Sequence, residues 1–227
     1  MKWGINVRYK KQVALLLVFF LIITISFLTM FGKSSLGENI EVSASVLSNK
    51  KIGWGIKRND NHLQPDLGRE NKRYLDEVEG IAMGSNEKKY VYLTFDEGYE
   101  AGYTFQILDV LKKTDVKAAF FITAHYLNSK SDLVKRMIDE GHIVGNHTVN
   151  HYSMPSLDDE KLKEEIMKLH ASLHEKFGYE MKYFRPPMGE YSQRTLALTK
   201  NLGYTTVMWS FAYDDWDVNK QRKSRIW

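Results

Sequence analysis

The chain has 227 residues, the size of one ordinary domain with short additions. Hydrophobic residues make up 43% and charged residues 26%, and the mean hydropathy is −0.41. This composition excludes a wholly disordered chain and a polytopic membrane protein. The absence of cysteine excludes disulfides, thiolate zinc sites, iron–sulfur clusters and a cysteine nucleophile.

The net charge of +4 comes from the two ends of the chain. Residues 1–12 and residues 220–227 each contain four basic and no acidic side chains, so the residues between them carry a net charge of −4. A mildly acidic body offers no electrostatic footprint for nucleic acid. We therefore expect no nucleic-acid partner.

An uncharged apolar run of nineteen residues covers residues 13–31, directly after the basic residues 1–12. As a helix it reaches about 28 Å, close to the thickness of a bilayer core. The run predicts a transmembrane signal anchor, and a signal peptide cleaved near residues 42–44 is the alternative. In both cases residues 1–12 stay cytoplasmic. The rest then lies outside, held on the cell membrane or, if cleaved, secreted to the cell wall or spore cortex.

Residues 32–56 are rich in Ser, Gly, Asn and Lys and predict a linker, and residues 57–87 predict a polar N-terminal extension with a short helix. Short strands then alternate with amphipathic helices. We expect strands over residues 91–95, 118–122, 142–145, 183–184 and 205–209, and helices over residues 103–113, 131–140, 156–177 and 192–202. This alternation predicts an α/β domain with a parallel sheet, either barrel or doubly wound, with active residues at the carboxyl ends of the strands.

Two carboxylates end the first of these strands. Asp96 and Glu97 are followed by Gly98, and at a strand end that runs into a glycine turn we expect both side chains to face the mouth of the sheet. A pair of acids that only stabilises a turn is the alternative.

Two histidines, His147 and His151, follow the third strand. One helical turn would put both rings on one side, and two neutral imidazoles with one carboxylate make a divalent metal site. His170 and His174 have the same spacing, but they border the apolar stripe of the helix over residues 156–177, so we interpret that pair as structural.

Arg185 ends the strand over residues 183–184 and precedes two prolines. Its guanidinium there can orient Asp96 and keep it ionised, whereas a plain surface arginine is the alternative. After the last strand, the side chains of Trp209, Tyr213 and Trp216 form either a wall for a sugar ring or a part of the core.

Four segments resemble, in order and spacing, the first four motifs of the polysaccharide deacetylases, the NodB-homology domain of carbohydrate esterase family 4. These segments are Thr94–Gly98, His147–His151, Arg185–Gly189 and Asp215–Trp216. The resemblance covers about residues 88–219. Trp54-Gly55 and residues 95–104 are similar to the spore-cortex branch, the delta-lactam-biosynthetic muramic acid de-N-acetylases.

The resemblance implies a distorted (β/α) barrel and a divalent metal ion, zinc or similar, as cofactor. It implies removal of acetyl groups from N-acetyl sugars, here in the glycan strands of peptidoglycan and with muramic acid of the spore cortex as the expected sugar. It also assigns roles to residues. The implied catalytic residues are Asp96 as base, Arg185, which orients the base, and Asp215, which pairs with the catalytic acid. The implied metal ligands are Glu97, His147 and His151. The implied substrate contacts are Met188, whose backbone N–H helps to hold the oxyanion, Tyr191 and Trp216.

The family's catalytic acid is a histidine of a fifth motif on a later strand, and none of the seven histidines of this chain lies late enough. We therefore expect a domain over residues 88–227 that is incomplete at its C-terminus. A truncated, inactive relative that only binds glycan or metal is the main alternative. A metal phosphoesterase is a further alternative, but no glycine-rich phosphate loop is evident.

Overall fold

The structure, a computed structural model, describes residues 47–212 and residue 215. The expected membrane anchor over residues 13–31 lies outside these residues, and no helix among them is both long and apolar enough to cross a membrane. In chain order the elements are β1 (Ile52–Gly53), α2 (Arg69–Glu77), β2 (Thr94–Glu97), α3 (Thr104–Thr114), β3 (Ala119–Ile122), α4 (Ala124–Ser129), α5 (Ser131–Asp139), β4 (Ile143–Asn146), the 3₁₀ turn η2 (Met154–Ser156), α6 (Asp159–Phe177), β5 (Tyr183–Phe184), the 3₁₀ turn η3 (Pro187–Gly189), β6 (Glu190–Tyr191), α7 (Gln193–Asn201) and β7 (Thr205–Thr206).

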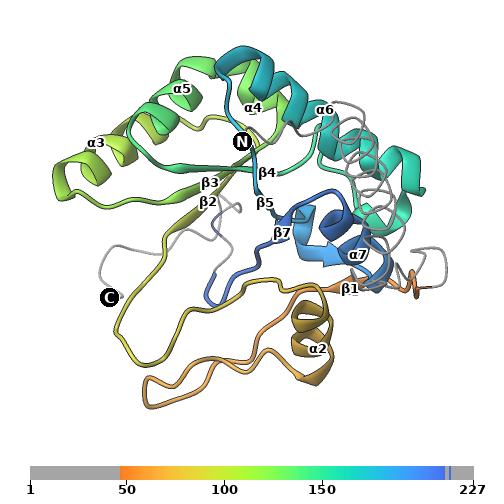
Figure 1. The fold of residues 1–227 in the computed structure, drawn as a ribbon. Helices are drawn as coiled ribbons and strands as arrows, with labels where there is room; N and C mark the ends of the chain where they lie inside the picture. The colour runs from red at the N-terminus through yellow and green to blue at the C-terminus, as the bar shows by residue number, and fades with distance from the viewer. Residues whose placement is uncertain (1–46, 213–214, 216–227) are drawn as a thin grey trace, which may run out of the picture. The chain divides into compact units, whose positions relative to one another are not determined.

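Five parallel strands form the main sheet in the order β2-β3-β4-β5-β7. Each strand lies beside its predecessor in this sheet, and the order never reverses as it does in a doubly wound fold. Helices α3, α4, α5 and α6 lie along one face of the sheet (Figure 1). The predicted parallel α/β architecture is confirmed, and of the two alternatives the strand order favours the barrel.

Helix α6 shows how the sequence sets an element. Asp158 accepts a hydrogen bond from the Lys161 N–H as the N-cap, and Gly178 ends the helix with a φ of 64°, a conformation that glycine adopts without strain. Of the two caps that the sequence allows, Ser156 and Asp158, the structure uses Asp158, because Met154–Ser156 forms a separate 3₁₀ turn. The apolar stripe of α6 is fully buried and consists of Leu162, Ile166, Leu169 and Leu173.

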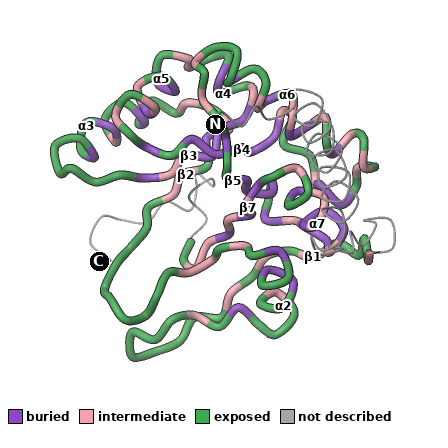
Figure 2. Tube along the Cα trace, viewed as in Figure 1, coloured by how far each residue is buried: buried purple, intermediate pink, exposed green. Residues whose placement is uncertain are grey.

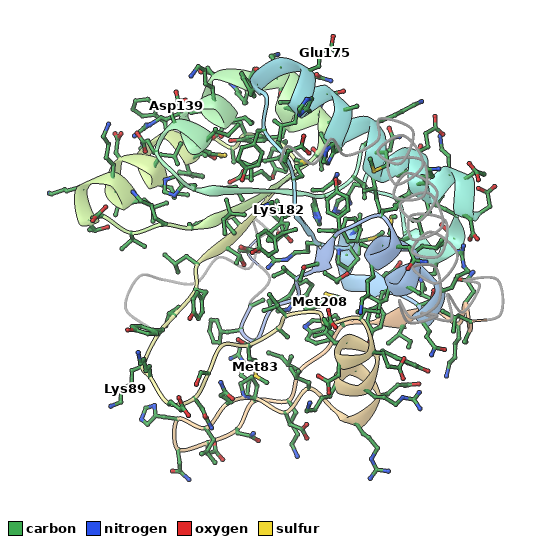
Figure 3. All side chains as sticks on the ribbon, in the orientation of Figure 1. Met83, Lys89, Asp139, Glu175, Lys182 and Met208 are labelled. Atoms are coloured by element: carbon green, nitrogen blue, oxygen red, sulfur yellow. The ribbon has the colours of Figure 1, made fainter. Side chains whose placement is uncertain are left out.

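Two hydrophobic clusters stabilise the described part. The larger fills the space between the sheet and helices α3 to α6, where Figure 2 shows the buried stretches of β3 and β4. The smaller joins α2, β6 and α7 and includes Met208, whereas Asp139 and Glu175 lie exposed on the outer helices (Figure 3).

The first strand begins later than predicted. We expected it over residues 91–95, but β2 covers Thr94–Glu97, because pairing with β3 starts only where Thr94 lies opposite Ala119. Val91 is 85% exposed. The apolar, β-branched run therefore marked the approach to the strand and not the strand itself.

The predicted linker over residues 32–56 contains structure at its end. Ile52–Gly53 forms β1, which pairs with β6 in an antiparallel ladder, and the Trp54 N–H donates to the Gly189 carbonyl at 2.8 Å. Ile52 and Trp54 pack against the smaller cluster, which is why this short segment is ordered. In the predicted extension, α2 is the expected short helix, and Ile81 forms a parallel bridge to Val207.

Candidate active site

Arg185 follows β5 at the carboxyl end of the sheet, and its buried guanidinium is fully engaged. Nη1 donates to Asp96 Oδ1 at 2.7 Å, and Nη2 donates to Thr94 Oγ1 at 3.0 Å. Nε donates to the Val207 carbonyl at 3.1 Å, and Nη2 also reaches the Met208 carbonyl at 3.3 Å. Contacts from β2 and from the segment after β7 thus fix one planar group, and the predicted contact with Asp96 is present.

A ring and a glycine support this guanidinium from β3 and β4. The Arg185 guanidinium carbon lies 4.2 Å from the centroid of the Phe121 ring, a favourable cation–π distance. Phe121 is paired with Gly145 in the ladder, and a Cβ at residue 145 would lie only 2.5 Å from the Phe121 ring. Glycine at this position therefore lets the ring sit where Arg185 needs it.

The two predicted imidazoles meet. The Nε2 atoms of His147 and His151 are 3.2 Å apart, and Asp96 Oδ2 lies 3.8 Å from His147 Nε2. His147 Nδ1 lies 2.8 Å from the Arg185 carbonyl, which can only accept, so Nδ1 carries the hydrogen and the Nε2 of the neutral ring carries a lone pair. Burial lowers the pKa of both imidazoles, while the Asp96 carboxylate opposes this effect. Both rings are therefore neutral at neutral pH, the form that binds metal.

The loop that carries the histidines is not the helical turn that we predicted. Thr148 has a φ of 71° and His151 a φ of 58°, both in the left-handed region that non-glycine residues rarely adopt. The Thr148 hydroxyl accepts a hydrogen bond from the His151 N–H at 2.9 Å. The rings converge, with centroids 4.8 Å apart, through these two backbone reversals.

Glu97 is buried, whereas its neighbour Asp96 is exposed. Glu97 is still part of β2, where adjacent side chains point to opposite faces, and it is 8% exposed. Burial raises its pKa to about 7, with the Glu100 and Asp96 carboxylates adding to the effect. Within residues 47–212 and 215, no three histidine or carboxylate side chains come together as a metal site. The third ligand implied by the resemblance is therefore not brought to the imidazole pair.

The donor set still suits a divalent cation. Two neutral imidazoles turn their Nε2 atoms toward each other, and a carboxylate oxygen lies nearby. His147 Nε2 presents its lone pair to His151 Nε2, so a proton or a cation can lie between the two nitrogens. His147 also has the outer hydrogen bond that orients metal-binding imidazoles.

The implied substrate contacts have different environments. Met188 is 55% exposed, with a φ of 58°, in the turn after Arg185. Tyr191 is 1% exposed, and its hydroxyl donates to Asn71 Oδ1 at 2.6 Å. Its side chain belongs to the smaller hydrophobic cluster, and we withdraw the prediction that it contacts substrate. Asp215 is exposed, and Trp216 lies outside the described residues.

The second histidine pair is structural, as we interpreted it. His170 bonds the Tyr204 hydroxyl through Nδ1 at 2.6 Å and Glu180 through Nε2 at 2.8 Å, while His174 Nδ1 lies 2.8 Å from Glu180. These contacts tie α6 to the segments before β5 and β7.

Sequence reasoning missed two groups near the site. Glu165 binds the histidine loop from α6, and its place three residues after Leu162, on the apolar face of the helix, was a usable signal. Trp54 is part of the resemblance, but its contact was missed: its Nε1 donates to the Trp209 carbonyl at 2.9 Å, and this partner lies 155 residues away.

Comparisons with known proteins show which family the chain belongs to. A family model described as polysaccharide deacetylase matches residues 83–207, more than half of the chain. The chain belongs to the polysaccharide deacetylase family. Members of this family are hydrolases, and the NodB-type fold expected from the resemblance is the fold of the family.

Individual relatives cover most of the chain. It is 48% identical over 181 residues to an uncharacterized 30.6 kDa protein in the fumA 3′ region of Geobacillus stearothermophilus. It is 40% identical over 180 residues to the peptidoglycan-N-acetylmuramic acid deacetylase PdaA of Bacillus subtilis. Each alignment covers 79% of this chain and 68% of the relative. The solved structure of PdaA, a family 4 carbohydrate esterase, superposes with a TM-score of 0.75 at 40% identity, over 78% of this chain and 76% of that one.

Proposed function

We propose that this chain is a metal-dependent hydrolase that removes N-acetyl groups from the amino sugars of peptidoglycan, with N-acetylmuramic acid as the sugar. The observation that carries the proposal is the Arg185–Asp96 pair beside two neutral, facing imidazoles. The family membership supports the deacetylase reaction, and the similarity to PdaA supports the choice of sugar.

Asp96 has the geometry of a general base. Arg185 binds Oδ1, so the carboxylate cannot rotate freely, and Oδ2 remains on the side of His147. A water molecule placed between this oxygen and the imidazoles can give its proton to Asp96 as it attacks an amide carbonyl. The fixed orientation reduces the reorganisation that the attack requires.

His147 and His151 would hold the metal, because both present neutral rings and converging Nε2 atoms. A bound divalent cation supplies Lewis acidity, which polarises a carbonyl oxygen and acidifies water. Arg185 serves this half of the site as well, since its backbone carbonyl fixes the His147 ring.

The turn after Arg185 offers a donor for the oxyanion. Pro186 and Pro187 have no N–H, so the N–H of Met188 is the first backbone donor after Arg185. The Trp54 N–H bonds the Gly189 carbonyl and so anchors the far end of the turn. We assign the Met188 N–H to the oxyanion, as the resemblance implies.

We propose further that residues 13–31 anchor the protein in the cytoplasmic membrane and that the hydrolase domain lies outside, where glycan strands are found. The basic residues 1–12 and the length of the apolar run support this topology. Protease added to intact protoplasts should digest the domain; full protection would contradict the proposal.

The test of the reaction is acetate release from purified peptidoglycan. We expect a chelator to abolish acetate release and added zinc to restore it. The variants Asp96→Asn and His151→Gln should release no acetate. His174→Gln, a histidine with the same spacing on α6, should retain acetate release. Mass spectrometry of the digested glycan should place the lost acetyl groups on muramic acid.

Two outcomes would count against the proposal. Acetate release that is indifferent to the chelator and to Asp96→Asn would exclude this mechanism. A folded, zinc-loaded protein that binds glycan without releasing acetate would identify the inactive relative instead.

A further inference from the structure

A buried carboxylate on α6 grips the loop that carries the two histidines. Glu165 is 1% exposed, and both of its carboxylate oxygens accept hydrogen bonds from Asn150. Oε2 accepts from the Asn150 N–H at 2.8 Å, and Oε1 accepts from Nδ2 at 2.6 Å. The backbone carbonyl of Glu165 also accepts from the Val149 N–H at 3.1 Å. One residue of the helix thus binds three donors of the loop.

Stability of the core does not explain this side chain. Glu165 lies on the buried face of α6, among leucine and isoleucine. In the described part of the chain no cationic nitrogen lies within 4.0 Å of its carboxylate, and Lys161 interacts with it only at longer range. A buried charge without a cation is costly, and an apolar residue would pack there at less cost. What a carboxylate adds is two acceptor oxygens, whereas a glutamine side chain has one acceptor and one donor group. Both oxygens are used here.

The two imidazoles differ in how they are held. The His147 ring is fixed by the Arg185 carbonyl. Among the described residues, the His151 ring has no hydrogen-bond partner other than His147, so the backbone of the loop decides where His151 lies. That backbone contains two residues, Thr148 and His151, in a strained left-handed conformation, which persists only if the surroundings enforce it. Asn150 lies between them.

We propose that Glu165 is a positioning residue that, through Asn150, holds residues 148–151 in the shape that brings His151 to His147 for metal binding. The inference rests on the proposed function for the metal, but the loop geometry can be measured without it.

The experiment compares four variants with the wild-type full chain: three single variants and a double variant that combines Asn150→Ala with Glu165→Gln. Asn150→Ala removes one of the three loop donors, Nδ2, at an exposed position, and Glu165→Gln removes an acceptor oxygen while keeping the size. Glu164→Gln is the matched control, because it alters the neighbouring residue on α6, which pairs with Lys161 and Lys168 on the surface. Zinc affinity is measured by competition with a chromophoric chelator, and amide hydrogen exchange of residues 148–151 is measured in the metal-free protein.

We expect Glu165→Gln to weaken zinc binding about 10- to 100-fold, the usual cost of losing an outer support of a metal ligand. Asn150→Ala should weaken it less, and the double variant should lose no more than Glu165→Gln alone, because both changes act on one grip. Amide hydrogen exchange of residues 148–151 should be faster in Asn150→Ala and in Glu165→Gln than in wild type. Glu164→Gln should match wild type in both zinc affinity and amide exchange.

Unchanged zinc affinity and unchanged loop exchange in folded Asn150→Ala and Glu165→Gln proteins would overturn the inference while leaving the proposed function intact. If Glu165→Gln does not fold, Asn150→Ala alone decides, and wild-type affinity and exchange in that variant would overturn the inference. A wild-type chain that binds no zinc would overturn both the proposed function and the metal part of the inference.

Discussion

The side chain of Arg185 uses its donors in a way that lysine cannot reproduce. Its planar fork binds Asp96, Thr94 and two backbone carbonyls, and its face lies on the Phe121 ring. A lysine ammonium is a point charge on a flexible chain, so it could keep a positive charge near Asp96 but not the orientation of the carboxylate.

At the residue scale we therefore predict that Arg185→Lys lowers kcat for acetate release about 100-fold, since a small misplacement of a reacting group costs about that much. KM should change little, because no substrate contact is removed. Arg136→Lys, which alters an arginine paired with Asp109 and Glu140 away from the site, is the control. An Arg185→Lys enzyme within threefold of wild type would refute this role.

At the scale of elements, a histidine helps to join β3 and β4. His142 Nδ1 accepts a hydrogen bond from the Ala118 N–H at 3.2 Å, just before the two strands pair. Burial lowers the pKa of His142, Lys117 adds to this effect, and Glu140 opposes it. The folded protein thus resists protonation of a ring that an unfolded chain protonates at its ordinary pKa of about 6.5.

The sign of the pH dependence follows. The contribution of His142 to stability is complete above pH 6.5 and is lost as the pH falls below 6.5 toward the lowered pKa, at no more than about 1.4 kcal/mol per pH unit. His142→Asn keeps an acceptor but cannot titrate, so its free energy of unfolding should fall less steeply in this range. Urea denaturation of the metal-free proteins between pH 5 and 8 measures the free energy of unfolding of each. The contribution of the other histidines is common to both proteins, so it cancels when the two free energies are subtracted. Parallel curves would contradict the prediction.

At the scale of the whole molecule, the segment before the sheet completes the site. Besides the β1–β6 ladder, Lys51 pairs with Glu190 at 2.9 Å, and Trp54 bonds the carbonyls of Gly189 and Trp209. A Cβ on Gly189 would lie 2.6 Å from the Trp209 ring and 3.0 Å from Trp54 Cβ, which shows how closely these segments approach. Gly189, at the end of the turn that holds Met188, is therefore enclosed between Trp54 and Trp209.

We predict that a chain starting at residue 47, five residues before β1, unfolds like the full chain and releases acetate at the same rate. A chain starting at residue 58 lacks β1 and Trp54 and should lose about 2 kcal/mol or more, the order of a large buried side chain. Its thermal midpoint should fall by about 4–8 °C, with a lower rate of acetate release. Equal midpoints for the two chains would show that the segment is dispensable.

The sequence predicted what local patterns determine. Apolar periodicity placed α3, α5 and α6 to within a few residues, and the strand ends located Asp96, Arg185 and the histidine pair. Prediction from the sequence failed for side chains whose direction or burial depends on contacts with residues far away in the chain. The direction of Glu97 depends on β2 extending by two residues, and the burial of Tyr191 depends on Ile52 and Asn71, more than a hundred residues earlier. The left-handed conformation of Thr148 and His151 could not be predicted, because neither residue is a glycine, the residue that usually marks such a conformation.

The bond between His147 Nδ1 and the Arg185 carbonyl has a consequence for how the site responds to change. The carbonyl belongs to the main chain, so it survives any substitution of the arginine side chain. Arg185 orients both the metal-binding ring of His147 and the carboxylate of Asp96, but it does so with different atoms: its carbonyl for His147 and its guanidinium for Asp96. A variant that lacks the guanidinium should therefore still bind zinc but release little acetate. Substitutions at position 185 can thus separate metal binding from hydrolysis.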